Sequence, residues 1–261
     1  MSEASELFLL STSGSSSCFG KVARVISTVE EARRVLARRN RARWVIEASA
    51  GLDLLVRIEA HNPWHRLLVL FETKPVRREC LQAQFRDVIA PGEGVHLLNK
   101  EELAEVFATD HPDDYFIGGV VNRDDDVLVL FRGNLERLLV PLAWFRNASR
   151  PVPDFDDFEV TDAGQTVRFG DYEAAADAVL YEFDSRARRR MKQRERAQDR
   201  SFGGALRRLR LQKGLSRSDF PGIDPKTVAR IERGEVSKPR EETLLILASA
   251  LGVAPEEIET Y

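Results

Sequence analysis

Cysteine is scarce in this sequence, which has only two in 261 residues, Cys18 and Cys80. Two cysteines cannot build a disulfide framework or a four-cysteine zinc site, so we expect the protein in the reducing cytoplasm. Long apolar runs are also missing, because no uncharged stretch reaches the ~18 residues that a membrane-spanning helix needs. The apolar run from Leu7 to Leu10 is too short for a signal peptide, and no Lys or Arg precedes it. We therefore expect no membrane partner.

Signatures of catalysis are missing as well. The sequence contains no phosphate loop, no dinucleotide fingerprint and no hydrolase elbow. The acidic clusters 124–126 and 154–157 lack the glycine and distal glutamate of a calcium loop, and are more typical of turns. We expect no catalytic residue, no cofactor and no metal site, and the protein is predicted not to be an enzyme. An enzyme within residues 1–112 stays open as a less favoured alternative.

Charge is distributed unevenly along the chain. The net charge is −3, but residues 113–185 contain six arginines, no lysine and 16 acidic residues, a net charge of −10. Residues 186–261 contain 18 basic and 11 acidic residues, a net charge of +7. A basic C-terminal third indicates a polyanionic partner for that segment.

The patterns along the chain predict an α+β multidomain protein. The pattern in residues 1–112 predicts an α+β domain of unknown role, with a serine-rich flexible loop or disordered leader at 11–17. The elements expected there are helices at 29–42, 76–89 and 101–107, and strands at 44–48, 54–59, 67–71 and 95–98.

The turn at residues 110–114 is expected to begin a small α+β middle domain, 113–184. Its expected elements are strands at 115–121, 127–131 and 135–140, a hairpin of 158–160 with 166–169, and a helix at 173–182. Residues 185–200 follow as a basic linker or a solvated helix, since 186–200 contain eight basic residues and two acids.

The C-terminal domain, residues 201–261, has clear helix punctuation and is predicted to contain five short helices. Ser201 can cap the first helix and Gly214 can end it. Ser216 to Asp219 resembles a capping box for a second, very short helix that stops at Pro221-Gly222. Asp224-Pro225 can start a third helix, 224–233, that buries Val228 and Ile231 and ends at Gly234. Pro239 and Pro255 introduce the last two helices.

These residues resemble the Cro/CI-type (XRE) helix-turn-helix family. The resemblance covers residues 201–258, and it is carried by Leu215-Ser216, Gly222-Ile223, Ile231-Glu232-Arg233-Gly234, Pro239 and the stretch from Leu244 to Gly252. It implies an all-α DNA-binding domain in which helix 224–233 reads the major groove. The chain is shorter than the family pattern between Leu215 and Ile223, so the angle between the second and third helices is open.

The resemblance also implies roles for individual residues. Base edges in the major groove are expected to meet Pro225, Lys226 and Arg230, and phosphate or neighbouring bases are expected to meet Thr227 and Arg217. The DNA backbone is expected to meet Ser237, Lys238 and Arg240, of which Arg240 can also reach the minor groove. Glu232 is expected to have a structural role inside the fold.

The middle segment, 113–184, resembles a small bacterial family of domains of unknown function that is sometimes fused to such helix-turn-helix domains. The resemblance is carried by residues 128–131, 140–145, 147–148, 158–160, 167–172, 177 and 181–182. It implies a small α+β fold without a known catalytic residue, and by default a binding or dimerisation role.

Together these features predict a bacterial, cytoplasmic, nucleoid-associated regulator of transcription, most simply a repressor. It is expected to bind double-stranded DNA as a homodimer, because readers of this type match two-fold symmetric sites. Residues 1–184 are expected to supply the dimer contact, or a site for a protein partner or a small-molecule effector. The alternative is the antitoxin of a toxin–antitoxin pair, whose front half binds a partner protein while the helix-turn-helix represses its own operon.

Overall fold

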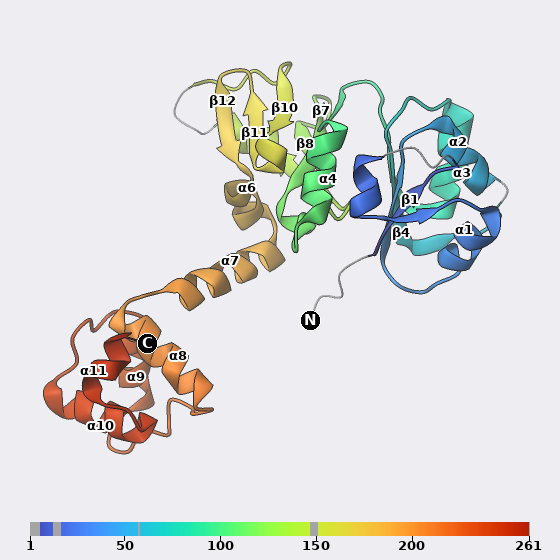
Figure 1. Ribbon diagram of the computed structural model, residues 1–261. Helices are drawn as coiled ribbons and strands as arrows, with labels where there is room; N and C mark the ends of the chain where they lie inside the picture. The colour runs from blue at the N-terminus through green and yellow to red at the C-terminus, as the bar shows by residue number, and fades with distance from the viewer. Residues whose placement is uncertain (1–5, 13–16, 57, 147–150, 261) are drawn as a thin grey trace. The chain divides into compact units, whose positions relative to one another are not determined.

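The computed structural model describes residues 6–12, 17–56, 58–146 and 151–260. Contacts divide the chain into two compact units, Met1–Ser185 and Arg186–Tyr261 (Figure 1). Residues 13–16 of the serine-rich loop, and residues 147–148 of the resemblance in the middle segment, lie outside the described residues. Within the described ranges, every helix is too short or too polar to span a bilayer.

The first unit opens with a parallel sheet and the helices that connect its strands. These elements are β1 (Glu6–Leu10), η1 (Cys18–Lys21), β2 (Arg24–Ile26), α1 (Val29–Leu36), β3 (Ala42–Ile46), α2 (Ser49–Val56), β4 (Asn62–Val69), α3 (Pro75–Gln84), β5 (Phe85–Ile89) and α4 (Lys100–Ala108). The five strands pair in the order β2-β1-β3-β4-β5, and every pair is parallel.

Both faces of this parallel sheet are covered. Phe8, Trp44 and Leu67 pair across three strands, and they pack with apolar residues of α1, α2 and α3 in one core. Arg43, which precedes Trp44 and points to the other face, lies over the Phe107 ring of α4 at 5.4 Å. All five residues of the central strand β3 are therefore buried, as is usual for a strand inside a parallel sheet.

Two antiparallel sheets complete the first unit. Their elements are β6 (Val95–Leu97), η2 (Pro112–Asp114), β7 (Phe116–Asn122), β8 (Val127–Arg132), β9 (Arg137–Pro141), α5 (Leu142–Arg146), β10 (Phe158–Thr161), η3 (Asp162–Gly164), β11 (Thr166–Phe169), β12 (Tyr172–Ala175) and α6 (Ala176–Phe183). The strand orders are β6-β7-β8-β9 and β10-β11-β12. Gly119 lets the sheets approach, since a Cβ there would lie 3.0 Å from the Phe158 ring.

Buried arginines connect the parallel sheet to the antiparallel sheet that begins with β6. Arg43 donates from Nη1 to the Gly133 carbonyl at 2.9 Å, and Arg66 pairs with Asp87 at 3.3 Å and with Glu136 at 3.0 Å. Burial lowers the pKa of Arg43 to about 10, so the side chain is still charged at neutral pH. The division of this unit at residue 112 stays a prediction, and β6 lies before that point although it pairs with β7 after it.

The expected strands and helices of the first unit are confirmed where the pattern is local, as in the hairpin of β10 with β11. The strand expected at 54–59 is wrong, because residues 49–56 form α2, the helix that joins two parallel strands. The helix expected at 76–89 ends at Gln84, and the chain continues as β5. Likewise β12 occupies the start of the helix expected at 173–182. A short apolar run has no periodicity that separates a helix from a buried strand.

The second unit is helical. Its helices are α7 (Ser185–Gln198, which starts at the last residue of the first unit), α8 (Phe202–Gln212), α9 (Pro225–Glu232), α10 (Glu241–Leu251) and α11 (Pro255–Thr260). Residues 185–198, for which a linker and a solvated helix were both open, are helical. The core is formed by Leu206, Leu209, Phe220, Val228, Ile231, Leu247, Ala248, Leu251 and Ile258.

The prediction of five helices in residues 201–261 is wrong. Across residues 201–260, all of which have a described backbone, four helices form, and the expected helix at 216–219 is a turn. Only five residues separate Gly214 from the buried Phe220, and Pro221 follows immediately. Such a segment is too short to offset the cost of nucleating a helix, and proline cannot donate a backbone hydrogen bond.

Acid is expected to destabilise the first unit through His65. This side chain is fully buried, its Nδ1 accepts a hydrogen bond from Trp44 Nε1 at 3.2 Å, and burial lowers its pKa to about 4. The unfolded chain has the ordinary histidine pKa of about 6.5 and takes up a proton first, so stability falls between about pH 6.5 and pH 4. At pH 5 the expected loss from this residue is about 2 kcal/mol.

Urea unfolding of the full chain at pH 7 and pH 5, followed by tryptophan fluorescence, measures this loss. His65→Gln can keep an acceptor for Trp44 but cannot titrate, so its acid loss should be smaller by about 2 kcal/mol. An acid loss of equal size in both proteins would contradict the assignment.

Candidate nucleic-acid interface

Helix α9 begins and ends where local chemistry dictates. The Asp224 carboxylate accepts a hydrogen bond from the Lys226 backbone N–H at 2.7 Å, and Pro225 occupies the first helical position. Gly234 ends the helix with a φ of 77°, a left-handed conformation that favours glycine. The start and end predicted for this helix are therefore confirmed.

One side of α9 is buried and the other is exposed. Val228 and Ile231 pack in the core of the second unit. Lys226 and Arg230 of α9 are exposed, as is Arg233, the C-cap residue that follows the helix. Their spacing of four and then three residues places the three side chains on one face. We call Lys226, Arg230 and Arg233 the basic face of α9. A row of cations on the exposed side of a capped helix has the chemistry to meet phosphates and guanine edges.

Arg233 is a member of the basic face that sequence reasoning did not select. It follows Glu232 and lies next to the helix end, so the family resemblance assigned it no role. Its signal in the sequence was the seven-residue spacing from Lys226, which places both side chains on one helix face.

The remaining predicted contact residues lie at different exposures. Pro225, Ser237, Lys238 and Arg240 are exposed, as are Lys226 and Arg230, whereas Thr227 and Arg217 are half-buried. Ser237, Lys238 and Arg240 follow α9 in the loop to α10, and Val236 in the same loop packs partly against the core.

The turn that precedes α9 is held by its own side chains. Ser216 donates its backbone N–H to Asp219 Oδ2 at 2.6 Å, and its hydroxyl accepts from the Ser218 N–H at 3.2 Å. Phe220 then enters the core with 2% of its surface exposed. The turn occupies the place where the family pattern has a second helix, so α9 is presented by a turn packed on α8.

Glu232, the last residue of α9, is the centre of a buried ion-pair network. It accepts hydrogen bonds from Arg210 Nε of α8 at 2.6 Å and from Arg217 Nε of the turn at 2.8 Å. Burial alone would raise the pKa of Glu232, but the hydrogen bonds from Arg210 and Arg217 outweigh it and lower the pKa. The structural role expected for Glu232 is confirmed.

Arg217 therefore has a partner inside the protein. Its side chain is 41% exposed and is anchored by Glu232, at the junction of the turn and α9. The contact of Arg217 with DNA stays a prediction. The side chain would have to make it while its Nε is bonded to Glu232.

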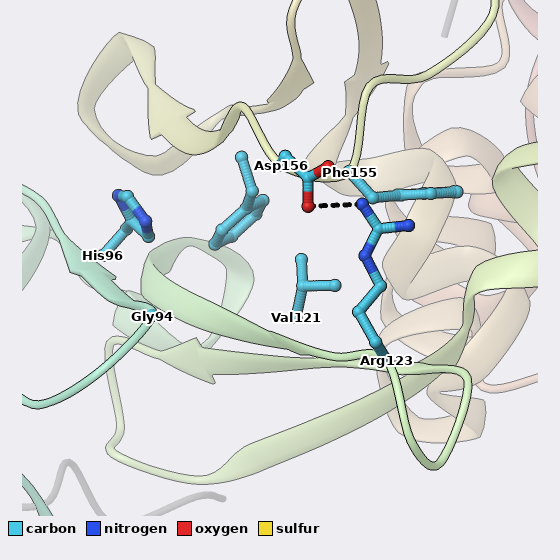
Figure 2. Close-up of a pocket in the computed structure, with 7 residues that line it drawn as sticks. Gly94, His96, Val121, Arg123, Phe155 and Asp156 are labelled. Atoms are coloured by element: carbon cyan, nitrogen blue, oxygen red, sulfur yellow. Dashed lines mark hydrogen bonds and ion pairs between the residues drawn. The ribbon is translucent and has the colours of Figure 1, made fainter.

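A second candidate site is a hollow of about 150 Å³ in the first unit (Figure 2). An ion pair of Arg123 with Asp156, 2.6 Å long, joins two of its walls. The Arg123 guanidinium also lies over the Phe155 ring at 5.5 Å. The hollow is lined by Gly94, His96, Val121, Arg123, Phe155, Asp156 and Phe158. Its charged groups are paired with each other, so the hollow by itself indicates no ligand.

We expect Glu232→Ala to destabilise the second unit by about 3–5 kcal/mol, because it leaves the Arg210 charge buried without its partner. Arg210 is 8% exposed at its side chain. Arg217→Ala removes a half-exposed partner and should cost at most about 1 kcal/mol. Differential scanning calorimetry of the full chain measures both. A loss of no more than about 1 kcal/mol in Glu232→Ala would show that the network does not hold the unit together.

Comparison with known proteins agrees with this geometry. Residues 201–260 match the family described as "Helix-turn-helix domain". No curated protein and no solved structure matches the chain. The matched range starts at the Ser201 cap of α8 and ends at the last residue of α11. Residues 201–260 are thus a helix-turn-helix domain, a class of domain that binds DNA.

Proposed function

We propose that this protein is a sequence-specific regulator of transcription, and specifically a repressor, that reads the major groove of double-stranded DNA with α9. The observation that carries the proposal is the basic face of α9, three exposed cations on one side of a helix in a helix-turn-helix domain. We further propose that the domain belongs to the Cro/CI-type (XRE) family of helix-turn-helix domains. We propose that the protein is bacterial and is associated with the nucleoid in the cytoplasm. No catalytic step is part of this function.

The proposal divides the contact residues by chemistry. Pro225, Lys226 and Arg230 meet base edges, where a guanidinium can bond guanine O6 and N7 together. Thr227 and Arg217 meet phosphate or neighbouring bases. Ser237, Lys238 and Arg240 meet the DNA backbone, where contacts fix the register of the protein without reading sequence.

The first unit has a separate role in this proposal. Residues 1–184 supply the contact between two copies, or the site of a protein partner or a small-molecule effector. This role is supported by the size of the first unit, whose core is separate from that of the helix-turn-helix domain. One domain of this class makes few base contacts, so two copies on one site are needed for specificity.

Affinity for DNA should reside in the second unit. Residues 186–261 carry a net charge of +7, whereas residues 1–185 carry a net charge of −10. Fragment 186–261 should bind duplex DNA with steep salt dependence, because cations release counterions from the phosphates. Fragment 1–185 should not bind. Titration of each fragment on a labelled duplex at several salt concentrations tests this, and equal binding by both fragments would overturn the assignment.

Arg230 and Lys238 should differ in what they contribute. Arg230→Ala should weaken binding to the duplex that the protein selects from a random pool, with a loss of about 1–3 kcal/mol relative to a scrambled duplex. Lys238→Ala should weaken binding to both duplexes alike and lower the salt slope by about one unit. If Arg230→Ala leaves the ratio of the two affinities unchanged, Arg230 does not read a base.

The full chain should be a homodimer, and fragment 186–261 should be largely monomeric. A dimer matches half-sites about one helical turn, roughly 34 Å, apart on two-fold symmetric DNA. Light scattering of both samples at tens of micromolar measures their masses. A monomeric full chain under these conditions counts against the proposed mode of binding.

A further inference from the structure

The backbone of Glu235 is held at a fixed place beyond the end of α9. The Gly234 N–H donates to the Ile231 carbonyl at 2.9 Å, and the Glu235 N–H donates to the Arg230 carbonyl at 3.0 Å. These two bonds, with left-handed Gly234 between them, make a Schellman motif. The position of the Glu235 backbone relative to Arg230 is therefore set by the helix end and needs no other partner.

The Glu235 side chain lies between two arginines of the basic face. Its Oε2 accepts from Arg230 Nε at 3.2 Å, and its Oε1 accepts from Arg233 Nε at 2.6 Å. The hydrogen bond from Arg233, with a further one from Arg230, lowers the pKa of Glu235, so the carboxylate is charged at neutral pH. All three side chains are at least 46% exposed, and the two arginines belong to the basic face that the proposed function turns toward DNA.

This arrangement determines which donor of Arg230 is already bonded within the protein. A guanidinium has five N–H donors on three nitrogens, and Glu235 takes the Nε donor. The two Nη groups at the tip are then the pair that can bond guanine O6 and N7. A guanidinium held at Nε also loses less freedom when it binds a base than a freely rotating one.

The carboxylate has a second consequence for binding. It places a negative charge beside Arg230 and Arg233, two of the three cations that would otherwise attract any phosphate. Arg230 and Arg233 are thus partly neutralised toward DNA of random sequence, whereas the bidentate bond to a guanine depends on direction as well as on charge. A carboxylate at this position therefore lowers the affinity for DNA of any sequence. It has less effect on the part of the affinity that depends on the base sequence.

We infer that Glu235 is a positioning residue for DNA recognition, which orients the Nη edge of Arg230 toward a base and weakens binding to DNA of other sequence. The inference rests on the proposed function, and it goes beyond it by assigning a specificity role to an acidic residue.

The test uses the full chain, the duplex that the wild-type protein selects from a random pool, and a scrambled duplex. Glu235→Ala should bind the scrambled duplex more tightly. Its preference for the selected duplex should fall about two- to fivefold, the range that exposed ion pairs are worth. Glu235→Gln removes the charge but keeps an acceptor for Arg230 Nε. It should tighten binding to the scrambled duplex as the alanine variant does, while keeping more of the preference.

A double-mutant cycle separates positioning from charge. In an Arg230→Ala background, Glu235→Ala should cause no further loss of preference, because the side chain that it orients is gone. The matched control is Glu256→Ala, which removes an exposed acid on α11 and should leave the preference unchanged. Circular dichroism of each variant verifies that the fold is kept.

Two outcomes would overturn the inference while leaving the proposed function intact. One is that Glu235→Ala prefers the selected duplex over the scrambled duplex as strongly as the wild-type protein does. The other is a loss of preference that is equal with and without Arg230, which would mean that Glu235 acts only through its charge. A wild-type protein that does not distinguish the selected duplex from the scrambled one would overturn the proposed function, and this inference with it.

Discussion

The helix-turn-helix domain depends on one buried carboxylate, that of Glu232. It joins three segments at once, because Arg210 comes from α8, Arg217 comes from the turn, and Glu232 itself ends α9. Arg210 also donates to the Leu215 carbonyl at 2.7 Å, so the same guanidinium holds the start of the turn. Removing these charges from water is costly, and only this geometry offsets the cost. The network therefore fixes how α9 lies on α8, and with it the direction of the basic face.

The shortened turn makes this constraint more important. A second helix would pack on α9 along its own apolar stripe, whereas the turn contributes mainly Phe220 to the core. Gly203 brings α8 close to α9, since a Cβ there would overlap the Ile231 carbonyl oxygen. Two features therefore hold α9 against its neighbours. One is the close backbone approach at Gly203, and the other is the ion-pair network of Glu232. The domain can thus hold α9 in place although residues 216–219 form a turn and not a helix.

The first unit uses arginine in a similar way. Arg132 pairs with Asp184 at 2.7 Å and also bonds the Asp113 carbonyl, close to the end of the unit. Arg43 and Arg66 extend from the parallel sheet. They bond Gly133 and Glu136, which lie between β8 and β9 of an antiparallel sheet. A planar guanidinium with several donors can bond carbonyls and carboxylates from separate segments together. Residues 1–112 and 113–184, which the charge and turn patterns predict to be separate domains, both lie in one compact unit.

The sequence by itself determined the features that depend on neighbouring residues. Ser201 and Asp224 cap their helices, and Gly234 and Gly252 end theirs, because each contact spans a few residues. The tertiary structure alone decided other features, namely the parallel sheet and the helix at 49–56. It also decided the pairing of Arg217 with Glu232. These features depend on partners distant in sequence, such as Arg43 and Gly133, 90 residues apart. Short apolar runs and isolated charges contain no local signal of which distant partner they will meet.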